Sequence, residues 1–138
     1  MPSLRLNGGS MAKSILPGIH HEIWMETDQT HTAHALGNPD VHVLATIYLI
    51  GFIETCCGVS VQSLLESHQA TVGTQVNISH RATAPAGARL RITSELLEVS
   101  GKHLTFSAQV YHRERLLMDG FHSRAILDKS FISKDLSG

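Results

Sequence analysis

The sequence predicts an α+β fold in which a curved antiparallel sheet wraps around one long central helix. Residues 41–65 are almost uniformly apolar, and Glu54 is their single formally charged residue. Four segments after this stretch alternate between apolar and polar residues, as strands buried on one face do. One further segment of this kind precedes the stretch, at residues 20–30.

The composition is that of one folded domain with a balanced charge. The chain has 138 residues, of which 42% are hydrophobic and 17% charged, so it can bury a core of its own. A net charge of −1 offers no electrostatic basis for binding nucleic acid. We expect a single domain at residues 11–138, after a flexible leader at residues 1–10 that ends in Gly-Gly-Ser. The first residues lack the pattern of a secretory signal, so a cytoplasmic location is expected.

The segment before the apolar stretch is predicted to form the first strand and a loop. In residues 20–30, Ile23 and Met25 alternate with the neighbouring Trp24 and Glu26. Residues 32–40 contain Gly-Asn-Pro-Asp and are expected to form a loop, because the proline disfavours helix just before it.

The apolar stretch at residues 41–65 is predicted to form a buried helix whose start Asp40 helps to cap. A helix that is apolar all round is either enclosed by protein or spans a membrane. The length would allow spanning. However, Glu54 lies in its middle, with Gly51 and Gly58 on either side, so we expect the enclosed helix and no membrane partner.

The second half of the chain is predicted to form a meander of four strands. Short turns at residues 85–87, 101–102 and 113–115 separate the strands, and short turns require antiparallel neighbours. The predicted strands are residues 69–84, 89–99, 103–112 and 116–127. In the first of them, alternation places these residues on one inward face: Val72, Thr74, Val76, Ile78, His80 and Ala82.

One strand, a long apolar helix and a four-stranded meander form the layout of the hotdog fold. A helix that is apolar on every side needs a wall on most sides, and a curved sheet supplies one. A single protomer leaves sheet edges and one flank of the helix uncovered, so we expect a homodimer.

Disulfide and metal chemistry are not expected. The two cysteines, Cys56 and Cys57, are adjacent, and neighbours in a helix point in different directions, so a disulfide between them would be strained. His31 and His34 could form a metal-binding pair, but no acidic or cysteine ligand accompanies them in the pattern. We expect both to lie at the surface without a metal. No phosphate-binding loop or dinucleotide fingerprint occurs, and no cofactor is predicted.

The candidate chemistry centres on Glu54. A lone carboxylate in an apolar helix is costly unless it is paired or functional. Thr46 lies eight residues earlier on the same stripe of the helix, roughly 12 Å away along the axis. His80 lies on the inward face of its predicted strand. From spacing alone, Glu54 and His80 are either an acid–base pair or a structural hydrogen bond, and both readings stay open.

An ordered set of residues then points to a family. The set is Ala45-Thr46, Gly51, Glu54 and Cys57, then Gly73-Thr74, then His80, Pro85 and Gly87, then Gly120, His122 and Arg124. At near-constant spacing from Val43 to Leu127, this set resembles the hotdog thioesterases of the fluoroacetyl-CoA thioesterase family.

The resemblance implies a catalytic group of Thr46, Glu54 and His80, with Gly73 lining the acyl pocket and Arg124 near the site. Such residues suit the hydrolysis of a small acyl-CoA, in which coenzyme A is part of the substrate. Glu54 can act as a nucleophile or as a base that activates water, and the sequence leaves this choice open.

Two other functions remain as alternatives, and the acyl group is open. A hotdog enoyl-CoA hydratase or dehydratase also uses a carboxylate and a histidine, and a non-catalytic acyl-CoA-binding module would use neither. Residues 37–42 contain no Phe, Tyr or Trp, whereas the fluoroacetyl enzyme has aromatic residues before its helix. The resemblance therefore does not imply selectivity for fluoroacetyl.

Overall fold

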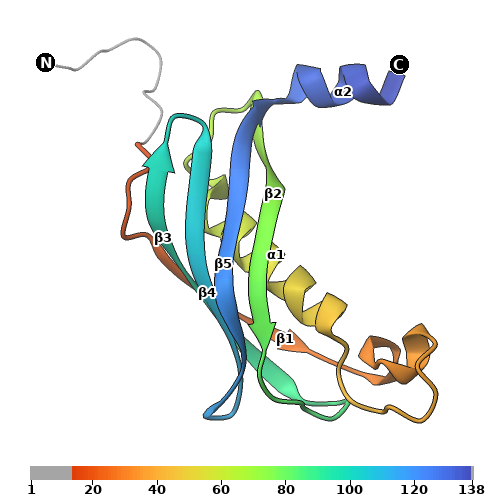
Figure 1. The fold of residues 1–138 in the computed structure, drawn as a ribbon. Coiled ribbons are helices and arrows are strands. Elements are labelled where there is room, and N and C mark those ends of the chain that lie inside the picture. Colours follow the sequence, from red (N-terminus) through yellow and green to blue (C-terminus); the bar gives the residue numbers. More distant parts are fainter. Residues whose placement is uncertain (1–13, 138) are drawn as a thin grey trace, which may run out of the picture.

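A five-stranded antiparallel sheet packs one face against a long helix, α1 (Thr46–Gln62), in the computed structural model, which describes residues 14–137 (Figure 1). The strands are β1 (His20–Glu26), β2 (Gln69–His80), β3 (Arg89–Ser100), β4 (His103–His112) and β5 (Arg115–Asp128). The predicted α+β arrangement of one long helix against an antiparallel sheet is confirmed. The leader predicted at residues 1–10 lies outside the described residues, as do the ends of the predicted domain.

The sheet order corrects the predicted meander. The order is β1-β3-β4-β5-β2, so β3, β4 and β5 follow one another as expected, but β2 pairs with β5 and not with β3. Residues 81–88 carry the chain from β2 across to β3. Three strand spacings are roughly 14 Å, a distance that eight residues span easily, so a loop of this length does not require a hairpin.

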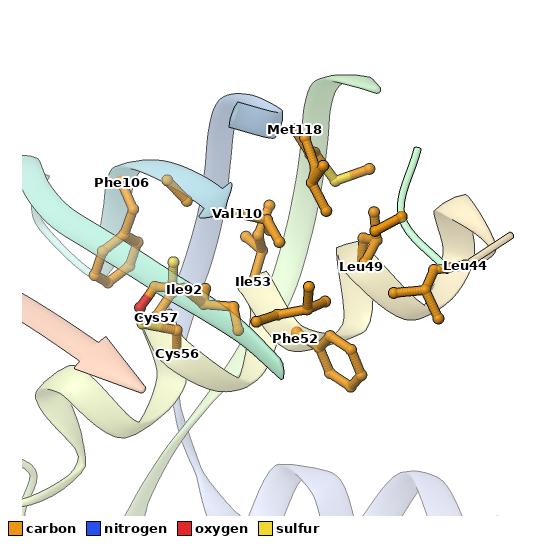
Figure 2. Packing of buried hydrophobic residues seen from close by; sticks show 14 of the residues in the cluster. Leu44, Leu49, Phe52, Ile53, Cys56, Cys57, Ile92, Phe106, Val110 and Met118 are labelled. Atoms are coloured by element: carbon orange, nitrogen blue, oxygen red, sulfur yellow. Dashed lines mark hydrogen bonds between the residues drawn. The ribbon is translucent and has the colours of Figure 1, made fainter. Parts of the chain in front are cut away.

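Helix α1 buries one stripe of side chains against the sheet. The buried residues recur at helical spacing and are Leu49, Phe52, Ile53, Cys56, Cys57 and Val61. Ile53, Cys56 and Cys57 lie beside the labelled sheet residues Ile92, Phe106 and Val110, which are fully buried (Figure 2). Each such apolar side chain stabilises the fold by about 1.5–3 kcal/mol.

The opposite side of α1 is open, as expected for a single protomer of this layout. Ile47 is 62% exposed and Val59 is 44% exposed. These outward positions are apolar although no other part of the described chain covers them. None of the helices between residues 14 and 137 is both long and apolar enough to cross a membrane.

The start of α1 lies five residues later than predicted, and Asp40 does not cap it. Ala45 is the N-cap residue and makes no side-chain hydrogen bond. The residues before it are held in extended form, because Leu44 bridges to Thr32 and its N–H donates to the carbonyl of Ala84. These hydrogen bonds use backbone groups that a longer helix would need.

The loop between β1 and α1 folds onto the helix. β1 ends at Glu26, and two 3-10 turns follow at Gln29–His31 and His34–Leu36. The ring of His31 meets the ring of Tyr48 edge-on at 4.9 Å, so His31 is half-buried rather than a surface residue as expected.

A register shift in β2 changes which residues face the helix. Gly73 pairs with Arg124, but Gln75 pairs with Ser123, so one extra residue is inserted between them. Because paired residues share a face, Gly73 lies on the inward face and Val72 does not. The predicted inward alternation therefore holds only after this bulge, where it includes His80.

The chain continues past β5 as a short helix that the sequence analysis did not predict, α2 (Lys129–Ser137), which projects away from the end of the sheet (Figure 1). The side chain of Asp128 accepts a hydrogen bond from the Ser130 N–H at 2.8 Å, which also lowers the pKa of Asp128. The Asp-x-Ser spacing was the available signal for this helix start.

Replacing Gly120 should destabilise the fold more than replacing Gly87. Both have positive φ, +153° and +91°, but a Cβ at Gly120 would overlap the Asn77 carbonyl of β2, whereas nothing lies within 4 Å of a Cβ at Gly87. We expect Gly120→Ala to lower the free energy of unfolding by about 2–4 kcal/mol and Gly87→Ala by about 1–2 kcal/mol. Denaturant unfolding measures both, and equal losses would contradict the close approach at Gly120.

Candidate active site

Two pairs of polar side chains lie on the open side of α1, at different positions along the helix axis. Thr46, the first residue of the helix, has its Oγ1 2.7 Å from Nδ1 of His80 at the end of β2. Two turns further on, Glu54 has its Oε2 3.7 Å from Nη1 of Arg124 on β5. The structure therefore brings Thr46 and His80 together and brings Glu54 to Arg124, but within one chain it records no contact between the two groups.

The second ring nitrogen of His80 lacks a partner. Nε2 of His80 is buried and has no hydrogen bond among the described residues. A buried polar atom without a partner costs about 1–3 kcal/mol. Such atoms call for a specific explanation, and a group supplied by substrate or water is one.

The carboxylate of Glu54 lies directly over Gly73. The Glu54 side chain is 49% exposed, so one side of the carboxylate remains open to solvent. A Cβ built on Gly73 would overlap Glu54 Oε2 and would lie 3.1 Å from Cε1 of His122. A side chain at this position would displace the Glu54 carboxylate, so the glycine lets the carboxylate rest against the backbone of β2.

Arg124 is held by a set of hydrogen bonds that uses most of its planar fork. Its Nε donates to Thr71 Oγ1 at 2.9 Å, and its Nη2 donates to the Thr71 carbonyl at 3.0 Å. The side chain is only 11% exposed, and burial lowers the pKa of Arg124 while the Glu54 carboxylate acts in the opposite direction. A Cβ on Gly58 would lie 3.3 Å from this guanidinium, which explains the glycine in the helix at that position.

His122 also lies at the site. Its signal in the sequence is its spacing of two residues from Arg124, which places both on one face of a strand. His122 is 1% exposed. Its Nδ1 lies 2.9 Å from the carbonyl of Gln75, and its Nε2 lies 3.2 Å from Nη1 of Arg124. Burial is the main cause of a lowered pKa for His122.

A cleft of about 590 Å³ opens beside the Glu54 carboxylate. It runs along the C-terminal half of α1 to the start of β2, and Arg124 and Lys129 contribute to its walls. Thr46 and His80 do not line it. A second hollow of about 640 Å³ lies around Trp24 and Arg113 and contains none of the predicted site residues.

One cluster in the described part of the chain has metal-ligating side chains. Ligand atoms of His34, Asp40 and His42 lie within 4.8 Å of one another, all exposed. However, Nδ1 of His34 already accepts a hydrogen bond from the Asp40 N–H at 3.0 Å. The neutral ring then carries its proton on Nε2 and offers no free lone pair. We therefore assign these residues to the shape of the loop.

Comparison with known proteins identifies the family of this chain. The family model described as fluoroacetyl-CoA-specific thioesterase (FlK) matches residues 27–130. The chain belongs to this family. The matched region contains the predicted site residues Thr46, Glu54, His80, Gly73 and Arg124. The predicted resemblance to this thioesterase family is thus confirmed.

Individual relatives agree with this assignment. The fluoroacetyl-CoA thioesterase of Streptantibioticus cattleyicolor is 28% identical over 85 residues, which are 62% of this chain and 61% of that protein. A crystal structure of the FlK thioesterase superposes with a TM-score of 0.82 at 23% identity, covering 91% of this chain and 98% of that one. A thioesterase superfamily member from Thermus thermophilus gives a TM-score of 0.82 at 21% identity, covering 90% and 92% of the two chains. These superpositions confirm the hotdog fold.

The two cysteines should be unreactive in the native protein. Both are buried and free, and burial raises the pKa of Cys57 to about 12 and also raises that of Cys56. Because the thiolate is the reactive form, an aromatic disulfide reagent at pH 8 should label neither thiol within minutes. The same sample in guanidinium should release both thiols. Rapid labelling of the native chain would contradict the burial of this part of α1.

Proposed function

We propose that this protein hydrolyses small acyl-CoA thioesters to the free acid and coenzyme A. The observation that carries the proposal is the Glu54 carboxylate, half-exposed at a cleft and paired with a buried arginine, in a chain of a thioesterase family. A carboxylate in this position can meet a thioester carbonyl while its other side is held by the protein. The chemistry needs no cofactor beyond the coenzyme A of the substrate.

The reaction adds water across the C–S bond. Either Glu54 takes a proton from a water whose oxygen attacks the carbonyl carbon, or Glu54 attacks first and water then cleaves the resulting anhydride. In both routes the C–S bond breaks and the thiolate of coenzyme A leaves with a proton. The Thr46 hydroxyl and the backbone N–H of Gly73 are the donors proposed for the developing oxyanion. His80, whose Nε2 is unpartnered, is the proposed proton carrier.

Gly73 and Arg124 are proposed to contact the substrate as well as Glu54. The position of Arg124 in the cleft wall supports this role, and its positive charge suits an acyl-CoA, which carries phosphates and a polarised carbonyl. Since residues 37–42 contain no Phe, Tyr or Trp, we propose several short acyl groups as substrates without a large preference for fluoroacetyl.

The working unit is proposed to be a homodimer that shares its sites. Thr46 with His80 and Glu54 with Arg124 are two separate groups on the open flank of one helix, about 12 Å apart along its axis. A two-fold axis across this flank would bring the first group of one protomer to the second group of the other. The exposed Ile47 and Val59, and the unpaired edge of β2, support an interface here.

Two rival functions give different products. A hydratase or dehydratase would change the enoyl absorbance of an unsaturated acyl-CoA without releasing thiol. A binding module would bind acyl-CoA saturably without turnover. The family match favours the hydrolase over both. We place the reaction in the cytoplasm, in keeping with two unpaired thiols.

Glu54→Gln should keep the fold and reduce hydrolysis by about 10²-fold or more, because an amide neither attacks as an anion nor takes a proton. The measurement is thiol release from a panel of acyl-CoA esters that includes acetyl, fluoroacetyl and longer chains. Glu98→Gln, at an exposed position on β3, is the matched control and should retain full activity. Activity of Glu54→Gln within a few-fold of the unmodified protein would reduce Glu54 to a structural role.

Mixing two inactive variants should restore activity if the sites are shared. Thr46→Ala and Glu54→Gln subunits, unfolded and refolded together, form mixed dimers in which one of the two sites has both groups intact. Random pairing then predicts recovery of about a quarter of the normal activity. No recovery, despite light scattering that shows mixed dimers, would place all catalytic groups of a site in one chain. A fully active monomer would contradict the dimer itself.

A further inference from the structure

His122 lies beneath the candidate site, and no step of the proposed hydrolysis uses it. Its ring and the Glu54 carboxylate meet on the same side of Gly73, because a Cβ built there would lie 3.1 Å from Cε1 of His122 and would also overlap Oε2 of Glu54. It is almost completely buried, and its two nitrogens contact a backbone carbonyl and the Arg124 guanidinium. A buried imidazole in such a position needs a reason, because an apolar side chain of similar size would avoid the cost of burying it.

The hydrogen bonds fix the protonation of this ring. An arginine guanidinium can only donate, so Nε2 of His122 must accept from Nη1 of Arg124. The carbonyl of Gln75 can only accept, so Nδ1 must carry the proton. The arrangement therefore holds only for the neutral ring with its proton on Nδ1.

We propose that neutral His122 is the positioning residue for Arg124: its Nε2 lone pair holds Nη1 of the guanidinium in the place from which it faces the Glu54 carboxylate. Thr71 accepts hydrogen bonds from Nε and Nη2 of the same guanidinium. His122 accepts from its third nitrogen, Nη1. Nη1 also lies 3.4 Å from the Glu54 backbone carbonyl. This inference rests on the proposed function, because it makes the pairing of Arg124 with Glu54 part of the site.

The surroundings of His122 make its protonation state decisive. The charged groups that face it are Arg124 from its own strand and Glu54 from α1. Phe106, its partner on β4, carries no charge. Burial raises the pKa of Cys57, which interacts with Arg124 and Glu54, to about 12, so that thiol stays neutral. If Nε2 of His122 were protonated, its N–H would face the N–H of Arg124 Nη1. Two donors repel each other, so Arg124 would turn away from Glu54.

The pH dependence follows from the sign of the shift. The pKa of His122 is lowered by burial and by the Arg124 charge, so the native state resists protonation more than the unfolded chain does. Between the native and the unfolded pKa the unfolded chain binds more protons, and stability falls as the pH decreases through this window. At the acidic end of the same pH window His122 becomes protonated in the native state, and Arg124 should then leave its position beside Glu54.

Two variants separate the positioning role from simple packing. His122→Gln has an amide oxygen that can take the place of Nε2 as acceptor for Arg124, and it does not titrate. His122→Asn is shorter and can bond only to Gln75, which leaves Arg124 without this acceptor. His103→Asn, at an exposed position on β4, is the control for exchanging a strand histidine.

We expect His122→Asn to lower kcat by about tenfold or more, because it displaces Arg124 from the Glu54 carboxylate, and to raise KM as well, because Arg124 lines the cleft and is proposed to contact the substrate. His122→Gln should recover most of kcat and should lose the part of the acidic decline in rate that His122 protonation causes. His103→Asn should match the unmodified protein in kcat and in its pH profile. Equal losses in the Gln and Asn variants, or an unchanged acidic decline in the Gln variant, would overturn the proposal.

A second readout does not need turnover. Nitrogen-15 NMR of the unmodified protein should show a neutral His122 ring protonated on Nδ1, and a protected Nε–H of Arg124. The arginine signal should persist in His122→Gln and lose protection in His122→Asn. If this pattern appears in a protein that releases no thiol from any acyl-CoA, the positioning geometry holds and the proposed hydrolase function fails. A ring protonated on Nε2 would overturn the positioning role whatever the activity.

Discussion

The buried guanidinium of Arg124 is the interaction on which the rest of the site depends. It joins β5, which carries it, to Thr71 on β2 and to Glu54 on α1. A planar fork of donors is suited to this, because each acceptor can be met in a fixed direction. Two glycines make room around it, Gly58 beside the guanidinium itself and Gly73 beside the carboxylate that it faces. Buried charge is expensive, so this part of the fold is stable only while all of these partners are present.

Much of this architecture could be predicted from the sequence, because local patterns encode it. The strand at residues 103–112 was predicted with its observed bounds, and the helix type of the apolar stretch was right. The pairing of β2 with β5 could not be predicted, because a loop of eight residues permits either neighbour. Asp40 does not cap α1, contrary to the prediction, because hydrogen bonds to distant segments hold the residues before the helix in extended form. One of them joins the N–H of Leu44 to the carbonyl of Ala84.

The candidate site was predicted unevenly for the same reason. Glu54 stood out as the charge in an apolar helix, and the inward face of His80 was predicted correctly because it lies after the bulge. The contact between Thr46 and His80 joins residues 34 positions apart, and no periodicity reports such a distance. The resemblance named these residues together, whereas their separation into two groups along α1 is visible only in three dimensions. An uncovered flank of the helix was expected, but which flank it is could not be predicted, because the residues of α1 are apolar on the open side as well.

The extra residue near Gly73 has a consequence for how this chain tolerates change in length. A strand presents alternate residues to opposite faces, so removing one residue between Gly73 and Gln75 would exchange the faces of everything in β2 before that point. A side chain would then stand where the Glu54 carboxylate now rests, and Thr71 would turn away from Arg124. Loops such as residues 81–88 can absorb an insertion or deletion by changing their path. Length variation should therefore be tolerated around the sheet but not at this one point within it.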